Sequence, residues 1–246
     1  MATQKSVIVV GVGAEEGLGG ALCKRFARSG EFHVFAAGRT QARLDALVAR
    51  IRLDGGAATA VPTDTTREDE VIRLFDAAQQ ETGAPPEVVL FNAGNNAFVD
   101  FRQTEAALFE DMWRVGCFGG FLVGREAARC MVPVGRGTVI FTGASGSLRG
   151  RPGFAHFASA KAGLRMIAQA MAREFGPQGL HVAHVIIDGG IAGERLKTLI
   201  PQFVAMKGEQ GLLDLDAIAE TYWQIHGQHP TAWTHEVDLR PFKEQF

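Results

Sequence analysis

The stretch SVIVVGVGAEEGLG, residues 6–19, decides the fold of this chain. Its first half, Ser6–Val12, is a short and nearly continuous apolar run, which is typical of a strand buried on both faces of a sheet. A glycine-rich turn follows, and from Leu18 to Ser29 apolar residues recur at helical spacing. Strand, glycine-rich turn and helix in this order predict the first βα unit of a parallel sheet.

The spacing of the glycines in this turn indicates what it binds. The common spacing G-x-G-x-x-G fails, because Glu16 stands where a third glycine would follow Gly11 and Gly13. The spacing G-x-x-x-G-x-G fits Gly13, Gly17 and Gly19. Residues without Cβ let the chain turn tightly and let a pyrophosphate approach the backbone at a helix N-terminus. The turn therefore predicts dinucleotide binding, with a purely structural turn as the alternative.

The rest of the chain repeats the alternation of strand and helix. The further strands are expected at Phe32–Gly38, Ala57–Thr63, Glu87–Asn92, Gly137–Gly143, His181–Ile187 and Ala232–Leu239. The further helices are expected at Thr40–Leu53, Arg67–Thr82, Thr104–Met131, Pro152–Phe175 and Asp214–Gly227. This order predicts an α/β fold with a doubly wound, Rossmann-like parallel sheet of about seven strands flanked by helices. No repeat or linker divides residues 1–246, so we expect a single dinucleotide-binding domain.

Composition narrows the class of protein. The chain is 46% hydrophobic and 21% charged, as in ordinary globular proteins. A net charge of −2 gives no electrostatic reason to expect nucleic acid or an anionic membrane as a partner. Glu15 and Glu16 follow the first apolar run, which argues against a signal peptide, and no run approaches membrane-spanning length.

The cysteines indicate the compartment. Cys23, Cys117 and Cys130 all fall in predicted helices, without paired spacing. An odd count of this kind argues against a disulfide framework and against a zinc site. We expect three buried thiols in a reducing, cytoplasmic compartment.

With these elements placed, the chain resembles the short-chain dehydrogenase/reductase family over most of its length. Three motifs carry the resemblance besides the glycine turn: Asn92-Ala93-Gly94 after the fourth strand, Asp64 after the third, and Lys161 as the lysine of a Tyr-x-x-x-Lys motif. The resemblance implies a nicotinamide cofactor and a small-molecule substrate. It assigns cofactor contacts to Gly13, Gly17, Leu18, Gly19, Arg39, Asp64, Thr65, Asn92, Ala93, Gly94, Lys161 and Ile191.

The end of the second strand bears on the choice between NADP and NAD. An acidic residue there would bind the ribose 2′-hydroxyl, whereas an arginine accommodates a 2′-phosphate. Gly38-Arg39 supplies the arginine, so NADP is expected and NAD is the alternative. Glu15 and Glu16 would repel phosphate if they pointed inward, and they would be harmless as first-turn acids facing solvent.

At the catalytic positions the chain departs from the family. In a carbonyl-reducing relative the Tyr gives a proton to the substrate oxygen, the Lys lowers its pKa and holds the ribose, and a Ser and an Asn assist. Here Phe157 stands for the Tyr, Ala144 for the Ser and Gly116 for the Asn. The Pro-Gly that flanks the nicotinamide becomes Asp188-Gly189. A phenyl ring has no proton to give, so the family mechanism cannot run unchanged.

Other residues are candidates for the missing role. Ser145 adjoins the Ala144 position, with Ser147 and Thr142 nearby, and His156 precedes Phe157. His156 lies about 100° around the helix from Phe157, so a helix-surface or supporting histidine is the alternative. Lys161 can bind ribose hydroxyls without any Tyr, and a solvated surface lysine is its alternative. The chain's only tyrosine, Tyr222, is expected to be a packing residue.

Two functional hypotheses remain open from the sequence. The first is an NADP-dependent oxidoreductase with a rearranged proton donor, its catalytic residues being Lys161 and Ser145. The second is an inactive cofactor-binding protein, sensor or partner subunit, and a scaffold without cofactor is a weaker third. Residues 190–213 interrupt the pattern and are expected to form a lid. The resemblance implies a homodimer or homotetramer through the helices Thr104–Met131 and Pro152–Phe175, where Gly116, Gly119, Gly120 and Gly124 serve either the interface or packing within the chain.

Overall fold

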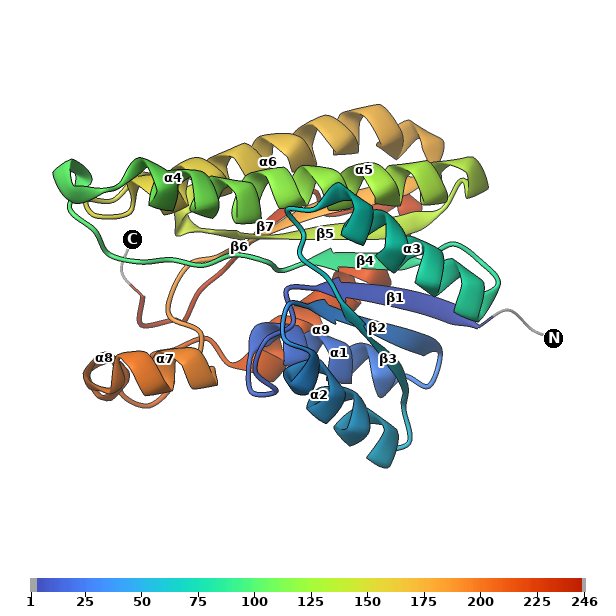
Figure 1. Cartoon of the computed structure of the whole chain (residues 1–246), viewed down its shortest axis with the longest axis horizontal. Helices are drawn as coiled ribbons and strands as arrows, with labels where there is room; N and C mark the ends of the chain where they lie inside the picture. Colours follow the sequence, from blue (N-terminus) through green and yellow to red (C-terminus); the bar gives the residue numbers. More distant parts are fainter. Residues whose placement is uncertain (1–3, 245–246) are drawn as a thin grey trace.

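A seven-stranded parallel sheet forms the centre of the molecule in the computed structural model, which describes residues 4–244 (Figure 1). The strands are β1 (Lys5–Val10), β2 (Phe32–Gly38), β3 (Ala57–Pro62), β4 (Val88–Phe91), β5 (Gly137–Ala144), β6 (Leu180–Ile187) and β7 (Glu236–Leu239). Their spatial order is β3-β2-β1-β4-β5-β6-β7, and every neighbouring pair is parallel. This confirms the doubly wound sheet predicted from the alternation of strands and helices.

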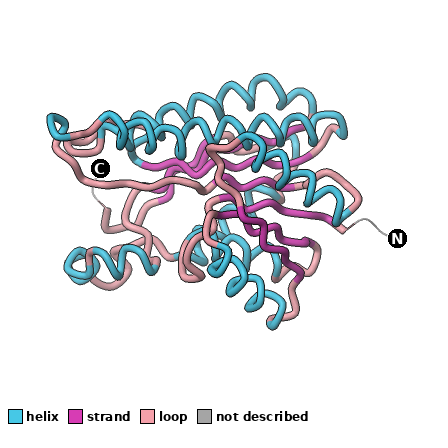
Figure 2. The backbone as a smooth tube through the Cα atoms, in the orientation of Figure 1, coloured by secondary structure: helices cyan, strands magenta, loops and turns pink. Residues whose placement is uncertain are grey.

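Helices cover both faces of the sheet (Figure 2). The helices are α1 (Leu18–Ala27), α2 (Gln41–Leu53), α3 (Glu68–Thr82), α4 (Ala106–Trp113), α5 (Gly119–Met131), α6 (Ala155–Phe175), α7 (Glu194–Leu199), α8 (Pro201–Lys207) and α9 (Leu215–His226). Val7 and Val9 of β1 pack with residues of α1, α2 and α9, whereas Ile8 and Val10 pack with residues of α3, α5 and α6. Burial of each side chain of this size stabilises the fold by about 1.5–3 kcal/mol. Because both faces of the sheet are covered, nearly every position of the inner strands is buried, and these strands are mostly apolar.

Two predicted element boundaries, and the expected loose structure of one segment, are wrong for local reasons. The helix expected from Pro152 begins at Ala155, because Gly153 has φ +81° and Phe154 is not helical. The strand expected from Ala232 begins at Glu236, since residues 230–232 form a 3₁₀ turn that starts with a proline. The segment after Gly189, expected to be loose, contains α7 and α8, which are too short to leave a clear periodicity in the sequence.

The long helix predicted at Thr104–Met131 is present as α4 and α5 joined by a π turn at Arg114–Phe118. Its glycines serve packing within the chain. A Cβ built on Gly120 would lie 2.2 Å from Leu164, and one on Gly124 would lie 2.7 Å from the sulfur of Met171. The glycines therefore bring α5 close to α6 and the sheet.

The cysteines are free thiols, and burial raises the pKa of each. Cys23 and Cys117 are buried as predicted, but Cys130 is only half-buried, because it lies in the last turn of α5 near the surface. Within residues 4–244, no helix has both the length and the apolar character that a membrane crossing requires.

Candidate active site

The loops that follow β1, β2, β3 and β4 meet at the carboxyl edge of the sheet, on the side where α7 and α8 lie (Figure 1). In doubly wound sheets ligands bind outside this edge, where neighbouring strands send their chains to opposite sides. In this chain that point lies between β1 and β4. All the residues predicted to contact a cofactor follow one of these strands, belong to α1 or α6, or lie in the segment after β6.

The glycine-rich loop is packed tightly at one end and open at the other. Gly11 has φ +86°, and a Cβ built on it would lie 2.5 Å from the backbone nitrogen of Ala93. A Cβ on Gly19 would lie 2.9 Å from the carbonyl oxygen of Gly11. By contrast, a Cβ on Gly13 would meet no atom within 4 Å. The backbone at Gly13 is therefore free for the close approach of a ligand, as the spacing predicts.

The N-terminus of α1 is available to an anion. Gly17 is its N-cap and no side chain caps it, so the amides of the first turn, at Leu18 and Gly19, have no acceptor within the helix. These amides and the helix dipole together favour a bound phosphate.

The two acidic residues of the loop do not oppose this arrangement. They lie in the turn before α1 rather than in its first turn, which corrects the prediction, but they do face solvent. Glu15 forms an ion pair of 2.9 Å with Lys24 of α1, and the exposed Glu16 lies 4.0 Å from Lys197 of α7. Both carboxylates therefore face lysine side chains of the same protein.

The loop after β4 is attached to the glycine-rich loop. The amide of Asn92 donates to the carbonyl of Val10 at 2.9 Å, and its side chain donates to the carbonyl of Gly11 at 3.4 Å. Ala93 is buried against Gly11, whereas Gly94 is exposed. Asn92 and Ala93 therefore pack beneath the start of the glycine-rich loop and hold it in place.

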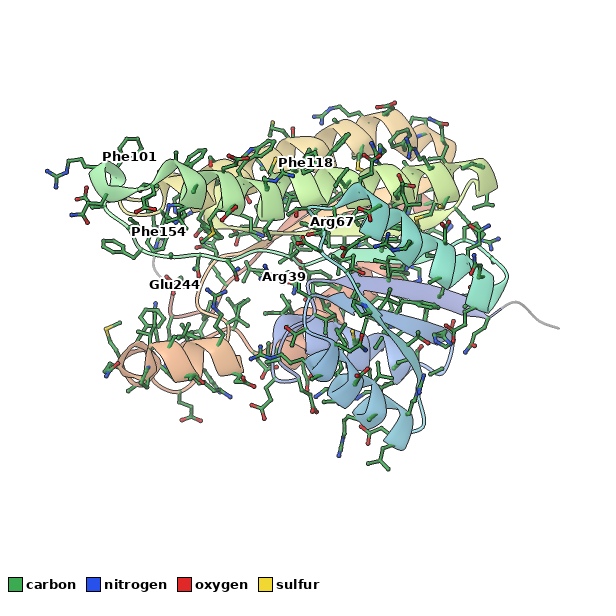
Figure 3. All side chains as sticks on the ribbon, viewed as in Figure 1. Arg39, Arg67, Phe101, Phe118, Phe154 and Glu244 are labelled. Atoms are coloured by element: carbon green, nitrogen blue, oxygen red, sulfur yellow. The ribbon has the colours of Figure 1, made fainter. Side chains whose placement is uncertain are left out.

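The loops after β2 and β3 hold the other predicted contacts. Arg39 is exposed at the end of β2 (Figure 3). Asp64 uses Oδ1 to accept from the amide and the hydroxyl of Thr66, at 2.9 and 2.8 Å, which fixes the turn. Thr65 is buried, and a Cβ on Gly119 would lie 2.8 Å from its hydroxyl. The side chain of Thr65 thus packs against α5, which leaves its backbone as the part that can contact a nucleotide.

Lys161 lies inside the molecule, so the alternative of a surface lysine is wrong. Its side chain comes from α6, only 6% of the residue is exposed, and Nζ donates to the carbonyl of Thr142 at 2.7 Å. Burial lowers the pKa of the ammonium to about 8. A Cβ built on Gly94 would lie 3.2 Å from Nζ, so the absence of a side chain at Gly94 leaves room beside the ammonium.

The residues expected at the other catalytic positions come from α6, the end of β5 and the π turn before α5. Phe157 lies one turn before Lys161 on α6, and its ring lies 3.1 Å from the position of a Cβ on Gly146. Ala144 ends β5 and is almost buried. The half-buried Ser145 follows it and opens a 3₁₀ turn. A Cβ on Gly116 would lie 3.1 Å from that of Ala160, so a larger residue there would press on α6.

A series of hydrogen-bonded polar side chains, which joins the turn after β5 to β6, β7 and α6, was not predicted from the sequence. The fully buried His184 of β6 accepts from the Ser147 hydroxyl at 3.3 Å and donates through Nδ1 to Glu236 at 2.9 Å. Glu236 is in turn held by two bonds of 2.7 Å from Arg165. Burial lowers the pKa of His184 to about 4, so the imidazole is neutral. The signal in the sequence was a histidine inside an apolar strand.

Asp188, which the sequence comparison places at the family's Pro position as an expectation, forms an ion pair with Arg149. It is 1% exposed, and Arg149 donates to its two oxygens at 3.0 and 2.8 Å. Arg149 comes from the loop after β5 and Asp188 from the end of β6. The carboxylate is therefore neutralised, and it does not stand as a bare negative charge at the site.

The candidate donor His156 and the chain's only tyrosine both have their polar atoms engaged elsewhere. His156 is fully buried rather than on the helix surface, because its Nε2 donates to the carbonyl of Ala97 at 3.1 Å in the loop after β4. Tyr222 is buried in the core, with its hydroxyl 2.8 Å from that of Thr142, which confirms it as a packing residue. Burial raises the pKa of the Tyr222 phenol, which makes it a poor acid.

The predicted lid, residues 190–213, is pinned at both ends. The amide of Leu213 donates to the carbonyl of Gly190 at 2.8 Å, and that of Ala192 donates to Leu213 at 2.9 Å. Ile191 pairs with Leu213 and packs against the core, close to the cofactor loop. The segment between these points is thus a closed loop that carries α7 and α8.

The lid contacts the cofactor loops on two sides. The amide of Glu194 donates to the carbonyl of Glu16 at 2.8 Å. Arg195 donates to the side chain of Asn95 at 2.6 Å and to the carbonyl of Asn96 at 3.2 Å. The start of α7 is therefore bonded to the loop after β1 and to the loop after β4.

The C-terminal segment holds the outer part of the lid. Glu244 pairs with Lys207 of α8 at 2.6 Å, and Lys243 donates to the carbonyl of Glu209 at 2.7 Å. Figure 3 shows Glu244 at the same end of the molecule as Phe154, which precedes α6.

Comparison with known proteins identifies the class that this fold and site define. Residues 5–199 match the model of the short chain dehydrogenase family, so the chain belongs to that family. The crystal structure of a short-chain dehydrogenase from Rhodopseudomonas palustris is 40% identical, with a TM-score of 0.82, over 97% of this chain and 99% of that one.

Other relatives are more distant. Gluconate 5-dehydrogenase of Gluconobacter oxydans is 28% identical over 76% of this chain and 72% of its own length. An alcohol dehydrogenase from Thermococcus sibiricus, solved with 5-hydroxy-NADP, has a TM-score of 0.82 at 19% identity over 98% of both chains, which shows the shared fold.

Proposed function

We propose that this protein binds NADP and acts as an oxidoreductase that interconverts a carbonyl compound and an alcohol. The observation that carries the proposal is the buried Lys161 ammonium beside the exposed Gly94, at the same edge of the sheet as the open backbone of Gly13. Bound NADPH would supply a hydride to the carbonyl carbon. The activities for which relatives are named, among them gluconate 5-dehydrogenase, agree with this class of reaction.

The cofactor would lie across the loops after β1, β2, β3 and β4. In this proposal the amides of the glycine loop hold the pyrophosphate, Arg39 takes the 2′-phosphate and Lys161 binds the nicotinamide ribose. The remaining contacts are proposed for Gly13, Gly17, Leu18, Gly19, Asp64, Thr65, Asn92, Ala93, Gly94 and Ile191. The exposure of Arg39 and the open space at Gly13 support this assignment, and NAD is the alternative cofactor.

Phe157, Ala144 and Gly116 are proposed to occupy the places of the family's Tyr, Ser and Asn. The proton must then come from another group, and Lys161 and Ser145 are the candidates. The same three residues favour a second function, an inactive cofactor-binding or partner subunit, because none of them carries a polar side-chain atom.

The first experiment is calorimetry with NADPH and NADH. We expect NADPH to bind more tightly, and Arg39→Ala to reduce this preference at least tenfold. No binding of either nucleotide at millimolar concentration would eliminate both functions. A screen of aldehydes and ketones then separates them: turnover supports the enzyme, and turnover that appears only in Phe157→Tyr supports the inactive subunit.

We also propose that the protein is a cytoplasmic homodimer or homotetramer. Large apolar side chains are exposed over α4, α5 and α6, namely Phe109, Trp113, Phe121 and Met166. Beside them an apolar groove runs between α5 and α6 and includes Ile167 and Met171. Exposed apolar surface of this kind is typical of an interface. Light scattering of the purified protein tests the proposal, and a monomer at micromolar concentration would refute it.

A further inference from the structure

We infer that Lys161 is itself the proton donor to the substrate oxygen, in the place where its relatives use a tyrosine hydroxyl. The inference rests on the proposed function, since it concerns the same site and the same reaction.

The hydrogen-bond inventory of Lys161 leaves protons to give. An ammonium has three N–H groups, and one of them donates to the carbonyl of Thr142 at 2.7 Å. Among residues 4–244, no carboxylate lies within ion-pair distance of Nζ, whereas Lys5, Lys24, Lys197 and Lys207 each have a carboxylate partner. Gly94, whose Cβ would lie 3.2 Å from Nζ, is exposed. Two N–H groups therefore remain for a ligand at the open side of Lys161.

The neighbouring elements leave this ammonium without a charged partner. His184 of β6 is neutral, since its pKa is lowered to about 4 by burial. Arg165, the next turn of α6, is neutralised by Glu236 of β7. Tyr222 of α9 reaches only the hydroxyl of Thr142, and its phenol stays protonated because its pKa is raised. Burial is thus the force that lowers the pKa of Lys161 to about 8.

An acid with this pKa suits proton transfer near neutral pH, because it is protonated at pH 7 and yet gives up its proton readily. The competing groups are less suitable. Ser145 has a hydroxyl of very low acidity, and no base is hydrogen-bonded to its side chain within the described chain. His156 is turned to the carbonyl of Ala97. Phe157 contributes only an apolar ring.

The step balances without any further reactant. As the carbonyl carbon gains a hydride from NADPH, the π pair of the C=O bond moves to the oxygen. One N–H bond of Lys161 breaks, its proton forms the O–H bond of the alcohol, and a neutral amine remains. Water at the open side of Gly94 returns the proton. In alcohol oxidation the neutral amine of Lys161 accepts the hydroxyl proton.

The test begins without catalysis. Lysines labelled with ¹³C at Cε are titrated by NMR in the nucleotide-free protein, and the Lys161 signal is assigned by its loss in Lys161→Arg. We expect this signal to titrate near pH 8, whereas the pKa of Lys5, which is exposed, is raised above its ordinary value. A Lys161 signal that titrates above pH 10 would overturn the inference.

The second readout is the reduction of 4-nitrobenzaldehyde by NADPH between pH 6 and 10. We expect kcat/KM to be constant at low pH and to fall tenfold per pH unit above about 8, because the ammonium is lost. Lys161→Arg keeps the positive charge but gives up no proton in this range, so turnover should fall about 10²–10⁴-fold while the NADPH Kd changes less than tenfold. Lys5→Arg is the matched control and should behave as the unchanged protein.

The outcomes separate this inference from the proposed function. If the unchanged protein does not bind NADPH, the proposed function fails and the inference fails with it. If it binds NADPH but reduces neither this aldehyde nor any other carbonyl compound of the screen, the enzyme function and the inference both fail. If it reduces the aldehyde but Lys161→Arg keeps both its turnover and the fall above pH 8, only the assignment of Lys161 is overturned. Should Lys161→Arg not fold, the pH profile and the titration of the unchanged protein decide the question.

Discussion

The two halves of the sheet's carboxyl edge differ in the kinds of residue that form them. The half after β1 and β4 consists of glycines and backbone amides, in which Gly11, Gly13 and Gly19 set the spacing. The half around β5 and β6 contains buried titratable side chains, among them Lys161 of α6 and His184 within β6. Glycine loops recognise a ligand by shape and are insensitive to pH, whereas buried ionisable groups make stability and reactivity depend on protonation.

The largest effect should come from the glycine half. Gly11→Ala forces a Cβ to within 2.5 Å of the Ala93 backbone at φ +86°, and we expect a loss of about 2–5 kcal/mol in the free energy of unfolding. Gly13→Ala is the matched control, because its Cβ meets nothing within 4 Å. It should change stability by less than about 1 kcal/mol but weaken NADPH at least tenfold. Urea unfolding and calorimetry measure both; equal losses of stability would contradict the packing described.

Acid should destabilise the titratable half. His184 has its pKa lowered to about 4 in the folded protein, so folding favours the neutral form. Its contribution is therefore complete above pH 6.5 and is lost as the pH falls toward 4, by about 3 kcal/mol.

Other buried histidines with lowered pKa values act in the same direction, so the informative quantity is a difference. Urea unfolding at pH 7.5 and pH 4.5 should show a smaller loss in His184→Gln than in the unchanged protein. Parallel losses in the two proteins would mean that His184 is not buried as described.

Lys161→Met should raise stability while it removes function. The folded protein holds the ammonium with a pKa near 8 against an unfolded value near 10.5, so the charge destabilises the native state below pH 8 and this cost disappears as the pH rises past 10.5. After allowance for the lost hydrogen bond to Thr142, we expect a gain of about 2 kcal/mol at pH 7. Guanidinium unfolding measures it, with Lys5→Met as an exposed control. A loss of stability in Lys161→Met would show that its charge is compensated.

The smallest effect should come from Tyr222→Phe, which leaves the Thr142 hydroxyl unpaired inside the core. We expect a loss of about 1–2 kcal/mol. A double-mutant cycle with Thr142→Val isolates the bond, since the pair of substitutions should cost less than the sum of the two. Strict additivity would show that the two hydroxyls do not interact.

The structure of the glycine half could be predicted from the sequence, because the residues that determine it are neighbours in the chain. A buried strand, a turn at G-x-x-x-G-x-G and a helical period lie within residues 6–29, and the structure forms that unit with small shifts of its boundaries. The parallel pairing of the strands follows from repeating the same unit, because each helix returns the chain to the start of the next strand. The short helices of the lid were missed because six or seven residues do not establish a period.

The contacts of the titratable half could not be predicted from the sequence, because they join residues far apart in the chain. Arg165 and Glu236 are separated by 71 positions, and nothing near either of them indicates the other. The motif predicts Lys161 as a site residue but does not predict its burial, because the carbonyl of Thr142 and the bare backbone at Gly94 enclose it. Burial of this kind is a tertiary property.

The contacts of the C-terminal segment have a practical consequence for handling the protein. Because Glu244 and Lys243 are fastened to α8 and the residues just after it, a tag or fusion attached beyond Glu244 would pull directly on the lid. The start of β1 lies at the opposite end of the molecule (Figure 1). Affinity handles and surface-immobilisation linkers therefore belong ahead of β1, away from α7 and α8.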